Sequence, residues 1–181
     1  MPADEFDVLG ISPSFDLDRA SVERAYLSRA TALHPDLATG SDDAARVSAE
    51  VNRAKAVLAN PESRADVLLR RLGGPGADRE KSLPPTFLAA IMEVREELEA
   101  GLQDCDAARR VGHVQRWEAW SRDERRRAIE EVGAMFRAVP PSGDVSLPAA
   151  LRAIRIRLNA WRYIERLIEQ LDPSRNPPPT P

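Results

Sequence analysis

The chain has 181 residues, of which 30% are charged and 5% aromatic, and its formal net charge is −3. This length allows one domain or two small ones, and the slightly acidic balance argues against a general nucleic-acid binder, which would carry a basic excess. Cys105 is the single cysteine, so neither an intrachain disulfide nor a cysteine-based zinc site is expected. No apolar run resembles a signal peptide or reaches membrane-spanning length, so we expect a cytoplasmic protein with no cofactor and no bound metal.

Residues 1–74 carry four helical patterns. Asp4 is placed to cap a short first helix, and Gly10 suits the C-terminal end of that helix. The second helix is expected to begin after Asp18 and to end at Leu33, because its apolar residues recur at helical spacing: Val22, Tyr26, Ala30 and Leu33. No convincing period-2 strand is present, so we predict an all-α fold.

The third helix is expected to start at Ser41 or Asp42 and to end near Asn60. Asn60 can cap a fourth helix whose first position is Pro61, where the missing N–H does no harm. Gly73 ends this helix, and residues 75–83, which are rich in Gly, Pro and polar side chains, are predicted to be a linker between two domains.

Between the second and third helices lies Leu33-His34-Pro35-Asp36. Pro35 disfavours helical geometry at His34, so the tripeptide is expected in a loop at the tip of a helical hairpin. Taken alone, His-Pro-Asp is also an ordinary turn sequence. With a short helix before the hairpin and another after it, however, about the first seventy residues resemble the J domain of DnaJ-type co-chaperones. In that family a His-Pro-Asp loop stimulates ATP hydrolysis by a DnaK-type chaperone.

The J-domain resemblance implies a chaperone-binding surface made of the loop and the second helix: His34, Pro35, Asp36, Tyr26, Arg24 and Arg29. Tyr26 matches the family's aromatic position in the second helix. Asp36 can accept a charge-assisted hydrogen bond from an arginine of the chaperone. Arg24 and Arg29 are available to steer the docking.

Three further helical patterns are predicted in residues 84–171, over 85–101, 106–139 and from Ser146 to Leu171. The last carries Leu147, Leu151, Ile154, Leu158, Trp161 and Ile168 at near-heptad spacing, and the second carries Ile129, Val132, Phe136 and Val139. Three such stripes can bury one another as an antiparallel bundle. Trp117 and Trp120 are interpreted as bundle packing rather than a ligand cage. Residues 172–181 hold five prolines and are predicted to be a disordered tail.

The pattern over 85–101 has two apolar stripes. One stripe is a buried face spaced i, i+4, i+7, i+11: Phe87, Ile91, Val94 and Leu98. Leu88 and Met92 form a separate apolar pair with glutamates beside it. This pair is either the edge of the bundle core or a partner-binding surface, since an exposed apolar patch with a polar rim marks an interaction site.

Phe87-Leu88 followed by the segment 93–98, and the segment 161–167, resemble the C-terminal domain of the HscB family of iron–sulfur co-chaperones. That family joins a J domain to a three-helix bundle that binds the scaffold protein IscU. The resemblance implies a scaffold-binding surface: Leu88, Met92, Glu93, Glu96 and Tyr163. Ala89 and Ala100 depart from a larger apolar residue and an acid in the family, which puts the affinity or the choice of partner in question.

The leading hypothesis is a co-chaperone that stimulates the ATPase of a DnaK/HscA-type chaperone and delivers an IscU-type scaffold to it. One alternative is a J-domain co-chaperone for a different client, and another is a structural interaction protein without ATPase stimulation. An enzyme is not expected, because His34 and His113 are the two histidines and neither has a nucleophile or ligand set at a meaningful spacing.

Overall fold

The computed structural model describes residues 3–32, 41–103, 106–170 and 172. All regular secondary structure within these ranges is helical, which confirms the predicted all-α class. The chain divides into two compact units, Met1–Pro75 and Gly76–Pro181. No helix in the described part of the chain is both long and apolar enough to cross a membrane.

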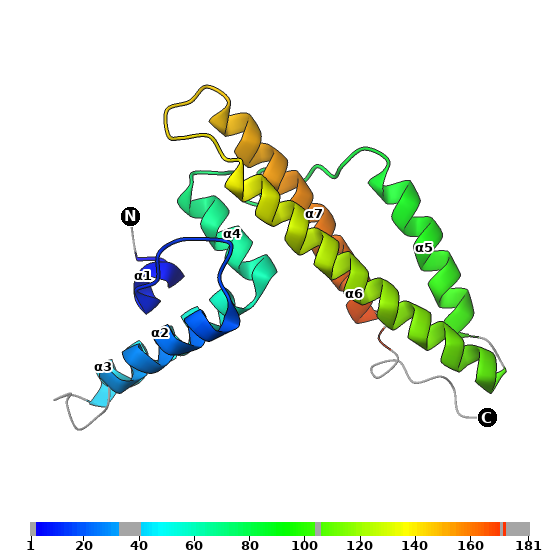
Figure 1. Cartoon of the computed structure of the whole chain (residues 1–181), viewed down its shortest axis with the longest axis horizontal. Helices are drawn as coiled ribbons and strands as arrows, with labels where there is room; N and C mark the ends of the chain where they lie inside the picture. The colour runs from blue at the N-terminus through cyan, green and yellow to red at the C-terminus, as the bar shows by residue number, and fades with distance from the viewer. Residues whose placement is uncertain (1–2, 33–40, 104–105, 171, 173–181) are drawn as a thin grey trace. The chain divides into compact units, whose positions relative to one another are not determined.

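The first unit contains α1 (Glu5–Leu9), α2 (Arg19–Ala32), α3 (Ser41–Ala59) and α4 (Pro61–Arg71). Helices α2 and α3 pack as an antiparallel pair, α1 packs against both, and α4 packs on α3 (Figure 1). The core of the unit takes apolar side chains from all four helices and from the segment before α2: Phe6, Leu9, Phe15, Val22, Val51, Leu58, Leu68 and Leu69. This is the helical hairpin with flanking short helices that the sequence predicts.

Local side-chain caps explain where these helices begin. Asp4 accepts hydrogen bonds from the amides of Phe6 (2.9 Å) and Asp7 (3.2 Å), while Asp7 accepts one from the Asp4 amide, which makes a reciprocal capping box. Asp18 accepts from the Ser21 amide, and Asn60 accepts from the Ser63 amide at 3.0 Å. The caps predicted at Asp4 and Asn60 are therefore confirmed, and α2 begins directly after Asp18, as expected.

A buried arginine links the segment before α2 to the C-terminal end of α3. Arg64 on α4 is 6% exposed; its Nε donates to the carbonyl of Phe15 at 2.9 Å, and its Nη1 donates to the carbonyl of Leu58 at 2.6 Å. Burial lowers the pKa of this guanidinium from its ordinary value. The side chain supplies donors to two main-chain carbonyls that lie far apart in the sequence.

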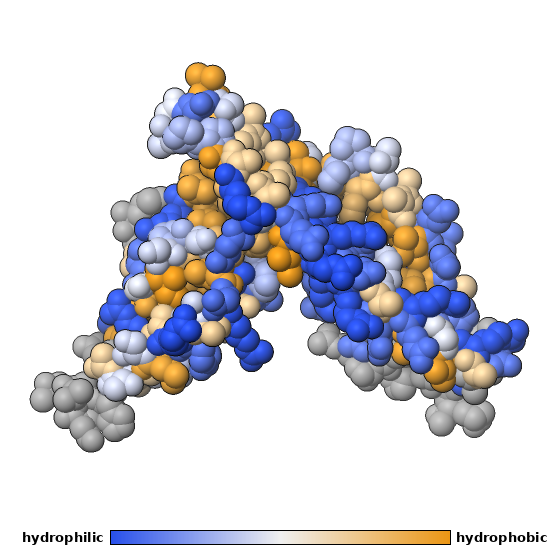
Figure 2. Space-filling model, in the orientation of Figure 1, coloured by the Kyte–Doolittle hydropathy of each residue, from blue (hydrophilic) through white to orange (hydrophobic). Residues whose placement is uncertain are grey.

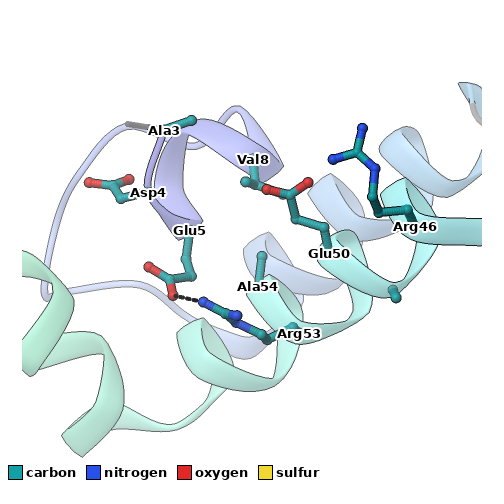
Figure 3. Close-up of a pocket in the computed structure, with 9 residues that line it drawn as sticks. Ala3, Asp4, Glu5, Val8, Arg46, Glu50, Arg53 and Ala54 are labelled. Carbon is teal, nitrogen blue, oxygen red and sulfur yellow. Dashed lines mark ion pairs between the residues drawn. The ribbon is translucent and has the colours of Figure 1, made fainter. Parts of the chain in front are cut away.

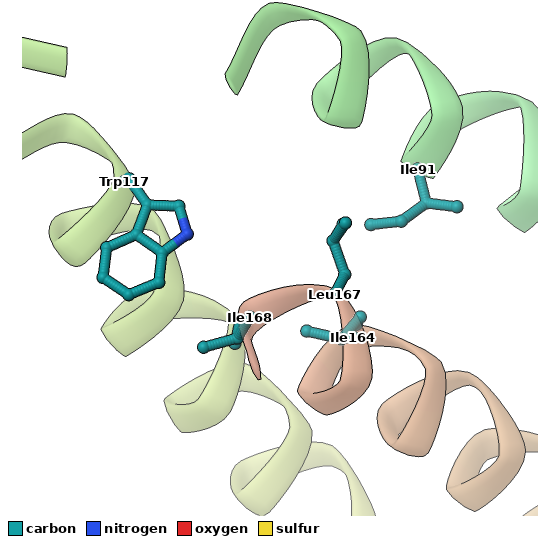
Figure 4. Packing of buried hydrophobic residues seen from close by; sticks show 5 residues of the cluster. All are labelled: Ile91, Trp117, Ile164, Leu167 and Ile168. Carbon is teal, nitrogen blue, oxygen red and sulfur yellow. The ribbon is translucent and has the colours of Figure 1, made fainter. Parts of the chain in front are cut away.

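The second unit contains α5 (Phe87–Leu102), α6 (Ala107–Arg137) and α7 (Leu147–Gln170). The three helices alternate in direction (Figure 1), and each packs against the other two. Figure 4 shows one apolar cluster to which all three contribute: Ile91 of α5, Trp117 of α6, and Ile164, Leu167 and Ile168 of α7. Hydrophilic side chains cover much of the outer side of α6 (Figure 2).

Most of the predicted stripes in this unit are confirmed. On α7, Leu151, Ile154, Leu158, Trp161 and Ile168 are buried, and Trp117 and Trp120 belong to the apolar cluster as packing residues. The prediction for Ile129 on α6 is wrong, because this side chain is 37% exposed. The buried line on α6 runs through Trp117, Ser121, Ala128 and Val132, and at 3.6 residues per turn Ile129 falls to one side of it.

The starts of α6 and α7 differ in how they are capped. Asp106 accepts a hydrogen bond from the Arg109 amide at 2.9 Å and caps α6. Ser146 directly precedes α7, as expected, and its carbonyl accepts from the Ala150 amide at 3.0 Å. Its hydroxyl, however, donates to the Asp144 carboxylate at 2.6 Å and lowers the pKa of that carboxyl.

Candidate functional site

The predicted chaperone-binding residues fall into two groups. His34, Pro35 and Asp36 lie outside the described residues, in the chain segment that connects α2 to α3. Arg24, Tyr26 and Arg29 lie on α2. The predicted role of all six residues stays a prediction.

The two predicted arginines on α2, Arg24 and Arg29, point in different directions. Arg24 is exposed, and its Nη2 donates to the Ser21 hydroxyl at 2.8 Å. Arg29 is also exposed, but its guanidinium lies near Gly10, so close that a Cβ there would be 2.9 Å from Arg29 Nη2. Five helix positions correspond to about 140° of rotation. Arg29 therefore places its charge at the C-terminal end of α1, which favours a cation, whereas Arg24 faces solvent elsewhere.

Tyr26 forms part of the contact between α2 and α3. Lys55 of α3 places its Nζ 4.0 Å from the centroid of the Tyr26 ring and 2.9 Å from Glu23 Oε1. The ammonium group thus makes a cation–π contact and an ion pair with two residues of α2. This arrangement fixes the Tyr26 ring within the helical hairpin, and it gives Glu23 a structural partner.

A hollow of about 380 Å³ lies between α1 and α3 in the first unit (Figure 3). Charged side chains of both signs line it, and Glu5 and Arg53 approach each other across it at 3.6 Å. None of the predicted site residues that the structure describes is among its lining residues. No sequence pattern predicts this hollow, because its two walls come from helices about forty residues apart.

The apolar pair on α5 faces solvent. Leu88 is 50% exposed and Met92 is 56% exposed, while Ile91 on the adjoining face is 6% exposed and belongs to the core. The pair is therefore a surface patch and not the edge of the bundle core. Glu93 and Glu96, predicted to belong to the same surface, are exposed as well.

Tyr163 of α7 connects to this part of α5 through an aromatic contact. Its ring meets the ring of Phe87 edge-on, with centroids 5.7 Å apart and planes at 90°. Phe87 is the first residue of α5 and directly precedes Leu88. The structure thus brings Tyr163 to the α5 end that carries the exposed pair, and both rings are partly buried against the apolar cluster.

The charge on α5 is mostly negative. Arg95 is the one basic residue among its 16 and pairs with Glu99, whose Oε1 accepts from Arg95 Nε at 2.8 Å. This hydrogen bond raises the pKa of Arg95. The surface around Leu88 and Met92 is consequently apolar with an acidic border, a composition that suits a partner carrying apolar and basic side chains.

Nothing in the described ranges is arranged to hold a metal: no group of three or more His, Cys, Asp or Glu side chains converges there. His113 on α6 lies beside Arg116, which contacts its ring nitrogens. Its ring also covers Gly101 of α5, where a Cβ would be 2.3 Å from His113 Nδ1. This histidine therefore serves the packing of α5 on α6.

Comparison with known proteins agrees with this architecture. The family model for the DnaJ domain matches residues 4–67. The HscB homolog of Burkholderia vietnamiensis, named a co-chaperone protein, is 32% identical over 172 residues, which cover 90% of this chain and 94% of the relative. The mitochondrial J-type co-chaperone jac1 of Schizosaccharomyces pombe is 28% identical over 160 residues, covering 87% of this chain and 65% of jac1.

Two solved structures share the fold. Chaperone HscB from Vibrio cholerae matches with a TM-score of 0.69 at 22% identity, covering 96% of this chain and 98% of that one. Human co-chaperone protein HscB matches with a TM-score of 0.71 at 21% identity, covering 97% and 84% respectively. Both matches include the J domain and the helical C-terminal unit.

The helical hairpin of the first unit and its DnaJ match define a J-type co-chaperone, whose partner is an Hsp70-type chaperone. The similarity extends through the second unit as well. The chain belongs to the HscB family of co-chaperones.

Proposed function

We propose that this co-chaperone stimulates the ATPase of a DnaK/HscA-type chaperone and delivers an IscU-type scaffold protein to it during iron–sulfur cluster assembly in the cytoplasm. The observation that carries the proposal is the exposed apolar pair on α5, Leu88 and Met92, which lie one helical turn apart and are bordered by acids. Membership of the HscB family supports the choice of partner.

The first step is docking of the J domain on the chaperone. Asp36 accepts a charge-assisted hydrogen bond from an arginine of the chaperone. Arg24 adds a solvent-facing positive charge that speeds encounter with an acidic surface. No proton transfer by His34 is needed, since ATP hydrolysis takes place on the chaperone.

The second step is capture of the scaffold by the bundle. Leu88 and Met92 insert into an apolar surface of the scaffold. Glu93 and Glu96 border this contact and favour a scaffold surface with basic side chains around it. Exposed side chains of this kind lose water on binding, and a few of them account for most of the affinity. Because both contacts belong to one chain, delivery becomes an intramolecular event with a raised effective concentration.

The test is the steady-state ATPase of the chaperone with this protein, measured with and without the scaffold. Asp36→Asn should abolish stimulation altogether. A Leu88→Ala/Met92→Ala/Tyr163→Ala variant should lose only the scaffold-dependent part, and Val145→Ala, which alters a 97% exposed side chain between α6 and α7, serves as the matched control.

Each outcome separates one hypothesis from another. Stimulation that is unchanged by the scaffold would keep the J-type role and assign the bundle to a different client. The exposed Ala89 and Ala100, which depart from the family pattern, are consistent with a different client. An absence of stimulation with several candidate chaperones would contradict the proposal and favour a structural interaction protein.

A further inference from the structure

The segment between the units is bound to the second unit. We call residues 76–82 the strap. Its first residues form a turn, in which the amides of Arg79 and Glu80 both donate to the carbonyl of Gly76 at 3.1 Å. Its last residue closes a second small loop, because the Ser82 amide donates to Glu80 Oε1 at 2.9 Å. The sequence predicts a linker over 75–83, but these contacts give most of it a defined path.

Two polar side chains of α7 hold the strap. Asn159 Nδ2 donates to the carbonyl of Glu80 at 2.9 Å and to the carbonyl of Ser82 at 3.0 Å. A side-chain amide has two N–H donors, and here both reach main-chain carbonyls of the strap. Arg152 Nε donates to Glu80 Oε2 at 2.5 Å, which is a charge-assisted hydrogen bond. Arg152 and Asn159 are seven residues apart and so share one face of α7.

The other end of the segment is bound to the first unit. The Gly73 amide donates to the carbonyl of Arg70 at 3.0 Å, and the Gly74 amide donates to the carbonyl of Leu69 at 2.9 Å. A Cβ on Gly74 would lie 2.3 Å from Leu69 Cδ1, so this close approach requires glycine. The chain is thus hydrogen-bonded to α4 up to Gly74 and to α7 from Glu80 onward.

We propose that Asn159 and Arg152 are positioning residues that seat the strap on α7 and so shorten the connection between the J domain and the scaffold-binding bundle. The expected effect on coupling rests on the proposed function, whereas the attachment of the strap to α7 does not. If the strap were released, the connection would run from Pro75 to Thr86 and span ~20 Å on average as a flexible chain. Effective concentration falls roughly as the −3/2 power of connection length, and the free connection would grow from residues 75–79 to residues 75–86, so release should lower coupling about fourfold.

Limited trypsin digestion tests the structural part, because Arg79 and Lys81 place two cleavage sites within the strap. Asn159→Ala/Arg152→Ala should raise the rate of cleavage after Lys81 by about tenfold, since a bound segment must open before it is cut. Asn159→Asp is a second variant of the same size that replaces two donors with an acceptor facing two carbonyls. Arg166→Ala, an exposed arginine farther along α7, is the matched control and should not change the rate.

The ATPase assay tests the consequence with the same full-length variants at subsaturating scaffold. Scaffold-dependent stimulation should fall several-fold in the Asn159 and Arg152 variants, while scaffold-independent stimulation and helical content by circular dichroism stay at wild-type values. Unchanged cleavage would overturn the strap itself. Faster cleavage with unchanged scaffold-dependent stimulation would overturn the tethering role. If the wild-type protein shows no scaffold-dependent stimulation, the proposed function fails, and the cleavage rates alone decide whether the strap is held.

Discussion

The rings of Phe87 and Tyr163 meet edge-on, and this contact attaches the start of α5 to α7. The start of α5 lacks a side-chain cap. Thr86 occupies the N-cap position with φ +64°; its hydroxyl donates to the carbonyl of Pro85 and accepts no hydrogen bond from an amide of the helix. The aromatic contact therefore replaces a local cap as the interaction that fixes the first turn of α5, directly beside Leu88.

We expect Phe87→Leu to lower the free energy of unfolding by about 1 kcal/mol, because the substitution removes the edge-to-face contact while keeping an apolar side chain. Tyr163→Phe keeps the ring and should leave stability unchanged. Chemical denaturation of the two variants checks both values. A neutral Phe87→Leu would show that other contacts hold the start of α5.

Substitutions at neighbouring residues on α5 should affect either the stability of the protein or its binding to the scaffold, but not both. Ile91→Ala should lower the free energy of unfolding by about 2–4 kcal/mol, because it opens a cavity among the buried residues of the cluster. Leu88→Ala and Met92→Ala should change stability by less than about 0.5 kcal/mol, since both side chains face solvent.

Isothermal titration calorimetry with the scaffold should show the opposite for the exposed pair: substitutions that barely change stability should clearly weaken binding. Each truncation should weaken binding by more than about 1 kcal/mol if it lies at the centre of the interface. Full affinity in the Leu88→Ala/Met92→Ala protein would contradict the proposed surface.

Arg64 is the buried charged residue among the described residues of the first unit, and its substitution should be costly. Arg64→Met keeps the aliphatic length but leaves the carbonyls of Phe15 and Leu58 without this donor, which should cost about 2–3 kcal/mol of unfolding free energy. Arg70→Met on the same helix breaks only an exposed ion pair with Asp66 and should cost less than about 0.5 kcal/mol. Equal effects of the two substitutions in urea denaturation would contradict a structural role for the buried guanidinium.

The carboxylate of Glu80 should titrate far below its ordinary range. Hydrogen bonds from the side chains of Ser82 and Arg152, and then from the Ser82 amide, lower its pKa from 4.5 to about 2. Because the folded-state pKa lies below the unfolded one, this interaction is fully present above about pH 4.5 and is lost as the pH falls through 2.

An NMR titration of the Ser82 amide proton checks this value, since that amide donates to Glu80. The midpoint should lie near 2 in the wild-type protein and move upward in both Ser82→Ala and Arg152→Ala. A wild-type midpoint near 4.5 would mean that the carboxylate does not make these hydrogen bonds in solution.

Local signals in the sequence predicted the elements well. Asp4, Asn60 and Asp106 cap the expected helices, because capping needs only an acceptor and amides two or three residues away. The second stripe on α5 likewise predicted the exposed pair, since helical periodicity alone separates Leu88 from Ile91. The apolar pattern on α6 predicts the wrong face for Ile129, because the small residue Ala128 occupies the buried position next to it.

The contacts that sequence reasoning missed join residues distant in the chain. Arg64 bonds to a carbonyl 49 residues away, and Asn159 bonds to carbonyls 79 and 77 residues away. A main-chain carbonyl carries no side-chain identity, so no sequence pattern marks it as the acceptor of a particular donor. The partner of Tyr26 was missed for the same reason, because nothing near Lys55 indicates which ring it will cover.

The chain has two lysines, and they lie in different units: Lys55 over the face of the Tyr26 ring and Lys81 within the strap. Acylation of Lys55 would remove the cation that joins α2 to α3, whereas acylation of Lys81 would leave the hydrogen bonds of the strap in place. Reactivity toward an amine-directed reagent should therefore be slow at Lys55 and fast at Lys81. A rise at Lys55 would report opening of the J-domain hairpin, separately from any change in the bundle.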